Sequence, residues 1–135
     1  QQDGMDIAFG TLNSLTLEIS FAGANNPCWI FRNSEIISLQ PDNQPIGIYI
    51  KEKPFTEQKF QLLKGDVLYL FTDGYESQFG GLKNEKFKTK NLKFLFSEIN
   101  TFPLSEQKQI IENKFLEWKG NLEQTDDVLV VGIKI

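Results

Sequence analysis

The 135-residue sequence contains no histidine, one cysteine and one arginine, and these absences exclude several kinds of chemistry. Without histidine, the chain has no histidine general base, no Ser-His-Asp triad, no phosphohistidine and few ways to hold zinc. A cysteine phosphatase carries arginine six positions after its thiol, whereas the residue six positions after Cys28 is Ser34. We expect Cys28 to be buried, as free cysteines usually are. Catalysis by this chain would therefore depend on oxygen ligands and metal-bound water.

Other shortages concern the partners and the location of the protein. The net charge of -4 leaves no basic excess, so nucleic acid is not an expected partner. No apolar stretch approaches the roughly 18 residues that a membrane span needs, and no signal peptide opens the chain. A single cysteine excludes an internal disulfide framework and is typical of a reducing compartment. We expect a cytoplasmic domain, which leaves open a membrane anchor in other domains of a parent protein.

What the chain does contain is a pattern of short strands followed by two helices. The hydrophobic content of 40% and the 12 phenylalanines predict one packed domain. Alternating or continuous apolar residues, bounded by turn residues, predict strands. These strands are expected at residues 6–12, 15–21, 28–31, 36–39, 55–63, 67–71 and 128–133. Residues 41–47 and 75–85 are predicted loops, the second exposed and mobile. Residues 92–99 and a segment capped by Ser105 predict helices. The fold class is therefore α+β.

Two acidic turns lie at the ends of the two most apolar predicted strands. Thr72-Asp73-Gly74 follows residues 67–71, and Thr125-Asp126-Asp127 precedes residues 128–133. Such continuous apolar runs predict strands that are buried on both faces. If the two strands are antiparallel neighbours, Asp73 faces Asp126 and Asp127 at one rim of a sheet. Crowded carboxylates either take up a proton or share a cation, typically a hard divalent ion. Each turn taken alone is equally consistent with an ordinary solvated turn.

The sequence around these turns resembles a known family of phosphatases. Residues 65–75 read Gly-Asp-Val-Leu-Tyr-Leu-Phe-Thr-Asp-Gly-Tyr, and Gln-Phe-Gly-Gly follows at 78–81. Together they resemble the bacterial metal-dependent serine phosphatases of the SpoIIE type, which belong to the PPM superfamily. Further matches occur in the family's order at residues 3–8, 22–27, 44–47 and 123–128. The likeness is greatest to versions appended to sensor modules in Bacteroidetes-type signalling proteins.

The resemblance implies a PPM-type antiparallel β-sandwich flanked by helices, with two Mn²⁺ or Mg²⁺ ions at one rim. It implies that Asp73 and Asp126 are metal ligands, and that Gly74, Asp127 and Asn25 lie near the site. In the family, a metal-bound hydroxide attacks the phosphorus of phosphoserine. The expected substrate is a phosphorylated signalling protein, such as an anti-sigma-factor antagonist, and the expected neighbours in the parent chain are N-terminal sensor modules.

The chain departs from the family pattern in one respect. Family members carry an earlier Gly-Asp-x-x-Gly-His-Gly-like segment whose aspartate helps to bridge the metals, and this sequence contains no such segment. We therefore expect residues 1–135 to be the C-terminal part of the phosphatase domain, with weak or absent metal binding and no activity alone. Unpaired sheet edges would then favour a homodimer. The alternative interpretation is a non-catalytic interaction or regulatory domain that retains the fold.

Overall fold

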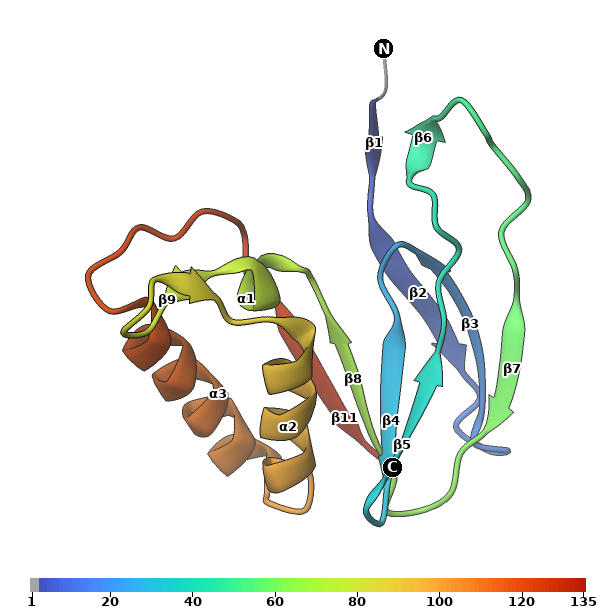
Figure 1. Ribbon diagram of the computed structural model, residues 1–135. Coiled ribbons are helices and arrows are strands. Elements are labelled where there is room, and N and C mark those ends of the chain that lie inside the picture. The colour runs from blue at the N-terminus through green and yellow to red at the C-terminus, as the bar shows by residue number, and fades with distance from the viewer. Residues whose placement is uncertain (1–2) are drawn as a thin grey trace. The chain divides into compact units, whose positions relative to one another are not determined.

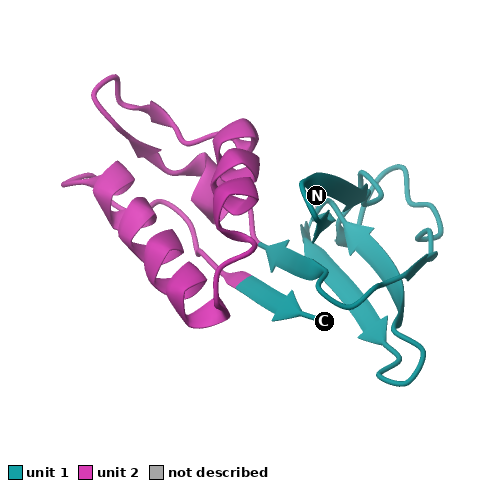
Figure 2. Ribbon diagram, turned by 90° about the horizontal axis from the view of Figure 1, so that it is seen from below, with its two compact units in different colours: residues 1–71, 131–135 teal, residues 72–130 magenta. Residues whose placement is uncertain are grey.

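The computed structural model describes residues 3–135, and the chain divides into two units (Figure 2). The first unit comprises residues 1–71 and 131–135, and the second comprises residues 72–130. The first unit contains the strands β1 (Asp3–Met5), β2 (Ile7–Leu12), β3 (Glu18–Ala24), β4 (Cys28–Arg32), β5 (Glu35–Leu39), β6 (Ile46–Ile48), β7 (Gln58–Gln61), β8 (Val67–Phe71) and β11 (Val130–Lys134) (Figure 1). The first residue of β11, Val130, is counted with the second unit. The second unit contains α1 (Gly74–Ser77), β9 (Phe79–Gly80), β10 (Glu85–Lys86), α2 (Thr89–Ile99) and α3 (Leu104–Lys119).

The first unit is built on two sheets that share one core. One sheet has the order β11-β8-β4-β5 and the other the order β2-β3-β7. The β2–β3, β3–β7, β4–β5 and β4–β8 pairings are antiparallel. Ile19 and Phe21 of β3 pack in the same buried cluster as Ile30 of β4 and Leu68 of β8. The predicted antiparallel sandwich in an α+β domain is therefore confirmed. Cys28 is fully buried in this cluster, as expected, and burial raises the pKa of its thiol to about 12.

Two predicted hairpins are confirmed, with one difference in a turn. β4 and β5 pair through Arg32 and Glu35, so that Asn33 and Ser34 form a two-residue turn. The turn between β2 and β3 is longer than Asn13-Ser14. The Asn13 side-chain oxygen accepts hydrogen bonds from the backbone N–H groups of Leu15 (2.9 Å) and Thr16 (3.0 Å). Because this side chain stabilises a turn, residues 15–17 do not extend the strand, and Leu15 exposes 93% of its surface.

The two apolar strands that carry the acidic turns differ in burial. β8 is buried as predicted, and four of its five side chains, those of Val67, Leu68, Tyr69 and Phe71, expose 6% or less. The prediction of a buried, central β11 is wrong. Among residues 3–135, β11 pairs only with β8 and forms the edge of its sheet. Leu129, directly before β11, and Val131 within it expose 58% and 38% of their surface. An edge strand lacks a neighbour that would cover its second side.

The second unit is more ordered than the sequence suggested. Residues 75–85, predicted as an exposed loop, contain α1 and most of the β9–β10 hairpin, and Tyr75 and Gln78 are buried. The Tyr75 ring packs against Phe87 and Phe115, at centroid distances of 5.1 and 5.0 Å, and its hydroxyl donates to the Ile111 carbonyl. These contacts join α1 to the segments around α2 and α3, which explains why the loop prediction was wrong.

The two predicted helices of this unit are confirmed as α2 and α3. Ser105 is not the N-cap of α3, because the helix begins one residue earlier, at Leu104, after the extended backbone of Pro103 (ψ 141°). A further small sheet in the first unit joins β1 to β6, although residues 46 and 47 were predicted to lie in a loop and no element was predicted for residues 3–5. Each of these strands has three residues, so neither gave a clear alternating pattern.

A buried ion pair ties β4 to the turn before β8. Arg32 donates through Nε to Asp66 Oδ1 (3.0 Å) and through Nη2 to Oδ2 (2.8 Å), and the Leu63 N–H also donates to Oδ2 (2.8 Å). Asp66 is 1% exposed. Burial alone would raise the pKa of Asp66, but the hydrogen bonds from Arg32 and Leu63 and the charge of Arg32 outweigh it and hold the pKa below its ordinary value.

Asp66→Asn should lower the free energy of unfolding by about 2 kcal/mol, because the buried residue 66 and the partly buried Arg32 lose their charge-assisted hydrogen bonds. A lowered folded-state pKa stabilises the protein above the unfolded-state value of about 3.9. This contribution is lost as the pH falls through the folded-state pKa. Urea unfolding across pH should therefore show a difference between wild type and variant that is constant near pH 7 and shrinks below about pH 4. A difference that does not change with pH would contradict this role.

Candidate functional site

Thr72 brings the two acidic turns together. Its N–H donates to the Leu129 carbonyl (3.0 Å), and its hydroxyl donates to the Asp127 carbonyl (2.9 Å). The same hydroxyl accepts a hydrogen bond from the Leu129 N–H (3.0 Å). The residue that follows β8 is thus bound to the segment that precedes β11. The predicted placement of the two turns side by side is confirmed.

Gly74 makes this approach possible. It is buried, it begins α1, and a Cβ atom at this position would lie 2.2 Å from the Asp127 carbonyl oxygen. No side chain fits at that distance, so only glycine lets the backbone of the first turn lie against the second. Gly74 and the Asp127 carbonyl are thus in direct contact, while the place predicted for both residues near a metal site stays a prediction.

The three carboxylates of the two turns are exposed. Asp73 stands directly before α1 and makes no side-chain capping bond to the helix. One oxygen of Asp126, Oδ1, accepts the N–H of Asp127 (2.7 Å). Asp127 contributes its backbone carbonyl to Thr72, while its own side chain lies at the surface. Asp126 therefore presents a carboxylate oriented by its neighbour, and Asp127 supports the turn through its main chain.

Asn25 lies in the first unit, whereas both acidic turns lie in the second. Its backbone has a positive φ of 60°, and its side-chain amide donates to Asp6 Oδ1 (2.8 Å). This bond anchors Asn25 within the first unit. Its expected place near the ligands stays a prediction.

The carboxylates of the two acidic turns fit a pair of divalent ions only in part. Carboxylate oxygens on adjacent turns are the donors that Mg²⁺ and Mn²⁺ prefer. Within residues 3–135, however, no three His, Cys, Asp or Glu side chains gather closely enough to hold a metal. Asp73 and Asp126 thus suit the chemistry of such ions, but the described residues do not make a complete site for them.

Two residues of this region were missed by sequence reasoning. Thr72 belongs to a predicted turn, but no sequence pattern indicated that its hydroxyl would bridge the two turns. Gln78 is fully buried, and its amide donates to the Glu123 carbonyl (2.9 Å), three residues before Asp126. The backbone carbonyl of Gln78 accepts a hydrogen bond from the indole N–H of Trp118 (2.9 Å). A glutamine in an apparently exposed loop gave no signal that it anchors the segment leading to Asp126.

Comparison with known proteins identifies the family. The model of the family described as Stage II sporulation protein E (SpoIIE) matches residues 5–135. The chain belongs to the SpoIIE family. No curated protein sequence matches this chain.

Solved structures show the same fold. The SiaA-PP2C domain of Pseudomonas aeruginosa has a TM-score of 0.79 at 24% identity, covering 87% of this chain and 46% of that chain. The PP2C phosphatase domain of SpoIIE from Bacillus subtilis, with a fragment of its regulatory domain, has a TM-score of 0.75 at 22% identity, covering 96% and 37%. The PPM Ser-Thr phosphatase MsPP from Mycobacterium smegmatis has a TM-score of 0.56 at 13% identity, covering 98% and 62%.

These matches establish a PP2C or PPM phosphatase fold for the SpoIIE-family chain. The chain spans about half the length of the structures that it matches. A SpoIIE phosphatase domain presoaked in Mn is among them, with a TM-score of 0.67 at 17% identity, covering 96% of this chain and 56% of that chain. No helix within residues 3–135 has both the length and the apolar character needed to cross a membrane.

Proposed function

We propose that this chain is part of a metal-dependent protein phosphatase domain that hydrolyses phosphoserine or phosphothreonine on a signalling protein. The observation that carries the proposal is the pair of acidic turns held together by Thr72 in a chain of the SpoIIE family. In this proposal, Asp73 and Asp126 are ligands, and Asp127 and Gly74 keep the turns in contact.

Two Mn²⁺ or Mg²⁺ ions, when bound, would activate water and neutralise the phosphoryl oxygens. Because the described residues supply too few donors, we propose that the remaining ligands come from a segment outside residues 1–135. The 135-residue chain should then bind metal weakly and show no turnover alone. N-terminal sensor modules of the parent protein would control its activity, and the domain would work in the cytoplasm on a substrate such as an anti-sigma-factor antagonist.

The experiment measures phosphate release from a phosphoserine peptide, with and without Mn²⁺, for the intact parent protein and for the 135-residue chain. We expect Mn²⁺-dependent release by the parent and none above background by the chain alone. Absence of activity in a folded, Mn²⁺-loaded parent would refute the phosphatase proposal. Robust turnover by the 135-residue chain would refute the proposal that ligands are missing from it.

A second candidate function is a non-catalytic interaction domain. The incomplete donor set favours it, as does the exposed edge strand β11, which offers a surface for pairing with a second copy of the chain. A parent protein that contains no metal-competent Gly-Asp segment would support this function over catalysis.

A further inference from the structure

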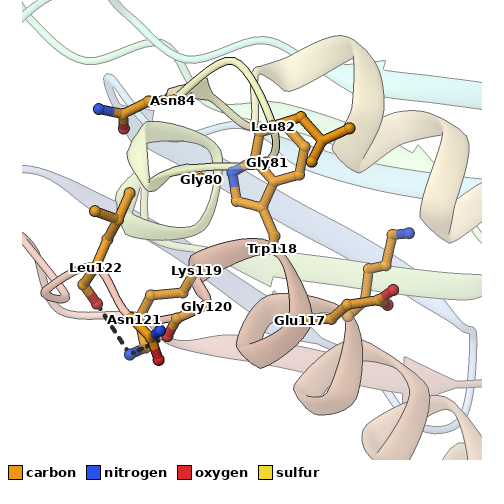
Figure 3. A pocket seen from close by; sticks show the side chains of 11 residues that line it. Gly80, Gly81, Leu82, Asn84, Glu117, Trp118, Lys119, Gly120, Asn121 and Leu122 are labelled. Atoms are coloured by element: carbon orange, nitrogen blue, oxygen red, sulfur yellow. Dashed lines mark hydrogen bonds between the residues drawn. The ribbon is translucent and has the colours of Figure 1, made fainter.

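The second unit contains a pocket between the β9–β10 hairpin and the C-terminal end of α3 (Figure 3). Its volume is about 530 Å³, which is within the range of sites that hold ligands or several side chains of a partner. The hairpin contributes Gly80, Gly81, Leu82 and Asn84, and the opposite wall comes from residues 114–122. No acidic-turn residue lines it, so it is separate from the candidate metal site.

The two walls are fixed to each other by backbone contacts. The Gly81 N–H donates to the Trp118 carbonyl (3.0 Å), and a Cβ atom on Gly80 would lie 1.8 Å from that same oxygen. The Trp118 indole N–H in turn donates to the Gln78 carbonyl. A pocket held in this way exists before a ligand arrives, which reduces the entropy lost on binding.

The pocket combines an apolar centre with a basic surround. Leu82 at the hairpin tip is fully exposed, and Leu82, Trp118 and Leu122 all line the pocket. Lys114 and Lys119 also line the pocket, together with one acid, Glu117. Leu82, Trp118 and Leu122 give the pocket apolar surface against which an apolar side chain of a partner can pack.

The hairpin and the segment that continues from it into α2 are rich in lysine. Residues 79–93 contain five lysines and one glutamate, a formal charge of +4 in a chain whose net charge is -4. The remainder of the chain therefore carries -8. Lys83 and Lys86 flank the residues of the hairpin tip, and Lys86 Nζ lies 5.9 Å from the ring centroid of Phe79. Of these five lysines, Lys83 stands between the pocket residues Leu82 and Asn84, while none of them lines the pocket itself.

The pocket is also connected to the segment that carries Asp126. The backbone carbonyl of Gln78 accepts a hydrogen bond from the Trp118 indole N–H, and the Gln78 side-chain amide donates a hydrogen bond to the Glu123 carbonyl. Leu122, a residue of the pocket wall, is followed directly by residues 123–127. A partner seated in the pocket would therefore contact the start of the segment that leads to this turn.

We propose that this pocket docks an acidic segment of the phosphoprotein substrate, with an apolar side chain placed against Leu82 and Trp118 and carboxylates facing the lysines. The identity of the partner as the substrate rests on the proposed function. Charge complementarity selects an acidic occupant, and the apolar centre selects a peptide over a small anion. A long polyanion such as RNA would meet the negative charge of the rest of the chain, whereas a short peptide would meet Lys114 and Lys119 with one lining carboxylate, Glu117.

The test uses the 135-residue chain and a short fluorescein-labelled peptide of glutamates around a central Leu-Phe pair, followed by fluorescence anisotropy at low ionic strength. Lys83→Glu combined with Lys86→Glu should weaken binding at least about ten-fold. Leu82→Ala, which removes an exposed side chain, should weaken it about three-fold. The matched control, Lys59→Glu with Lys64→Glu, makes the same change in net charge on exposed lysines of the first unit and should change binding less than about two-fold.

Several outcomes would overturn the proposal. These are no binding of the peptide, equal losses in the two double variants, or an unchanged affinity in Leu82→Ala. Single-stranded RNA and phosphatidylserine vesicles are tested in parallel. The proposal would be wrong if either of them bound the chain more tightly than the peptide does and if that binding were lost in the Lys83→Glu/Lys86→Glu variant. Because peptide binding needs no metal, the phosphatase assay fails or succeeds separately. An active parent without peptide binding refutes the docking site alone, and peptide binding with an inactive parent refutes the phosphatase function alone.

Discussion

Asp126→Asn in the intact parent protein should lower the rate of phosphoserine hydrolysis at least about 100-fold, and Asp73→Asn should do the same. Asparagine keeps the size of the side chain but removes the negative charge that attracts a divalent cation. The Asp126 carboxylate is already oriented by the Asp127 N–H, so the substitution should change its charge more than its position. Initial rates measured across a range of Mn²⁺ concentrations would show the loss, and part of it should be recovered at high Mn²⁺.

The neighbouring carboxylates supply the controls. Asp127→Asn should reduce the rate less than about three-fold, because its contribution to the turn is the backbone carbonyl that Thr72 binds, and asparagine keeps that carbonyl. Glu98→Gln, at an exposed position of α2, should leave the rate unchanged. Equal losses in Asp126→Asn and Asp127→Asn would contradict the separate roles proposed for the pair. Full activity in Asp73→Asn and Asp126→Asn would remove both residues from the site.

Gly74→Ala should lower the free energy of unfolding by about 3 kcal/mol, near the upper end for forcing an extra carbon into a packed region. Its Cβ would lie 2.2 Å from the Asp127 carbonyl oxygen and 3.2 Å from a methyl carbon of Val128. Both obstacles belong to one short segment, so relief requires the two acidic turns to separate. The hydrogen bonds of the Thr72 hydroxyl should then be lost as well.

Gly10→Ala is the matched control, because a Cβ at Gly10 in β2 meets its nearest atom at an ordinary contact distance of 3.5 Å. It should change the free energy of unfolding by less than about 0.5 kcal/mol. Chemical unfolding of both variants, followed by tryptophan fluorescence, would make the comparison. A Gly74→Ala protein as stable as Gly10→Ala would show that the turns can separate without loss, and the assignment of Gly74 as the contact point would be wrong.

The sequence predicted those elements whose determinants lie close together in the chain. The continuous apolar runs of residues 67–71 and 28–31 identify their strands, because burial of both faces sets the pattern directly. The adjacency of the two acidic turns was also predictable, since antiparallel neighbours bring an exit and an entry to the same rim. Asp73 and Asp126 were reached by this reasoning together with the family resemblance.

Other features depend on contacts between distant residues and left no local pattern. The run in residues 128–133 is as apolar as that in β8, yet β11 is an edge strand, because strand order is decided by the whole sheet. Gln78 and Tyr75 are buried by Trp118, Phe115 and Phe87, which lie at least nine residues later in the chain. The bridging hydroxyl of Thr72 likewise has its partners more than 50 residues away.

The bridge made by Thr72 has a consequence for how the two acidic turns come to lie together. Because one hydroxyl binds both Asp127 and Leu129, neutral hydrogen bonds hold the turns beside each other without help from a cation. The fold therefore sets the spacing of the two turns before any cation binds, and a site arranged in advance loses less entropy on binding.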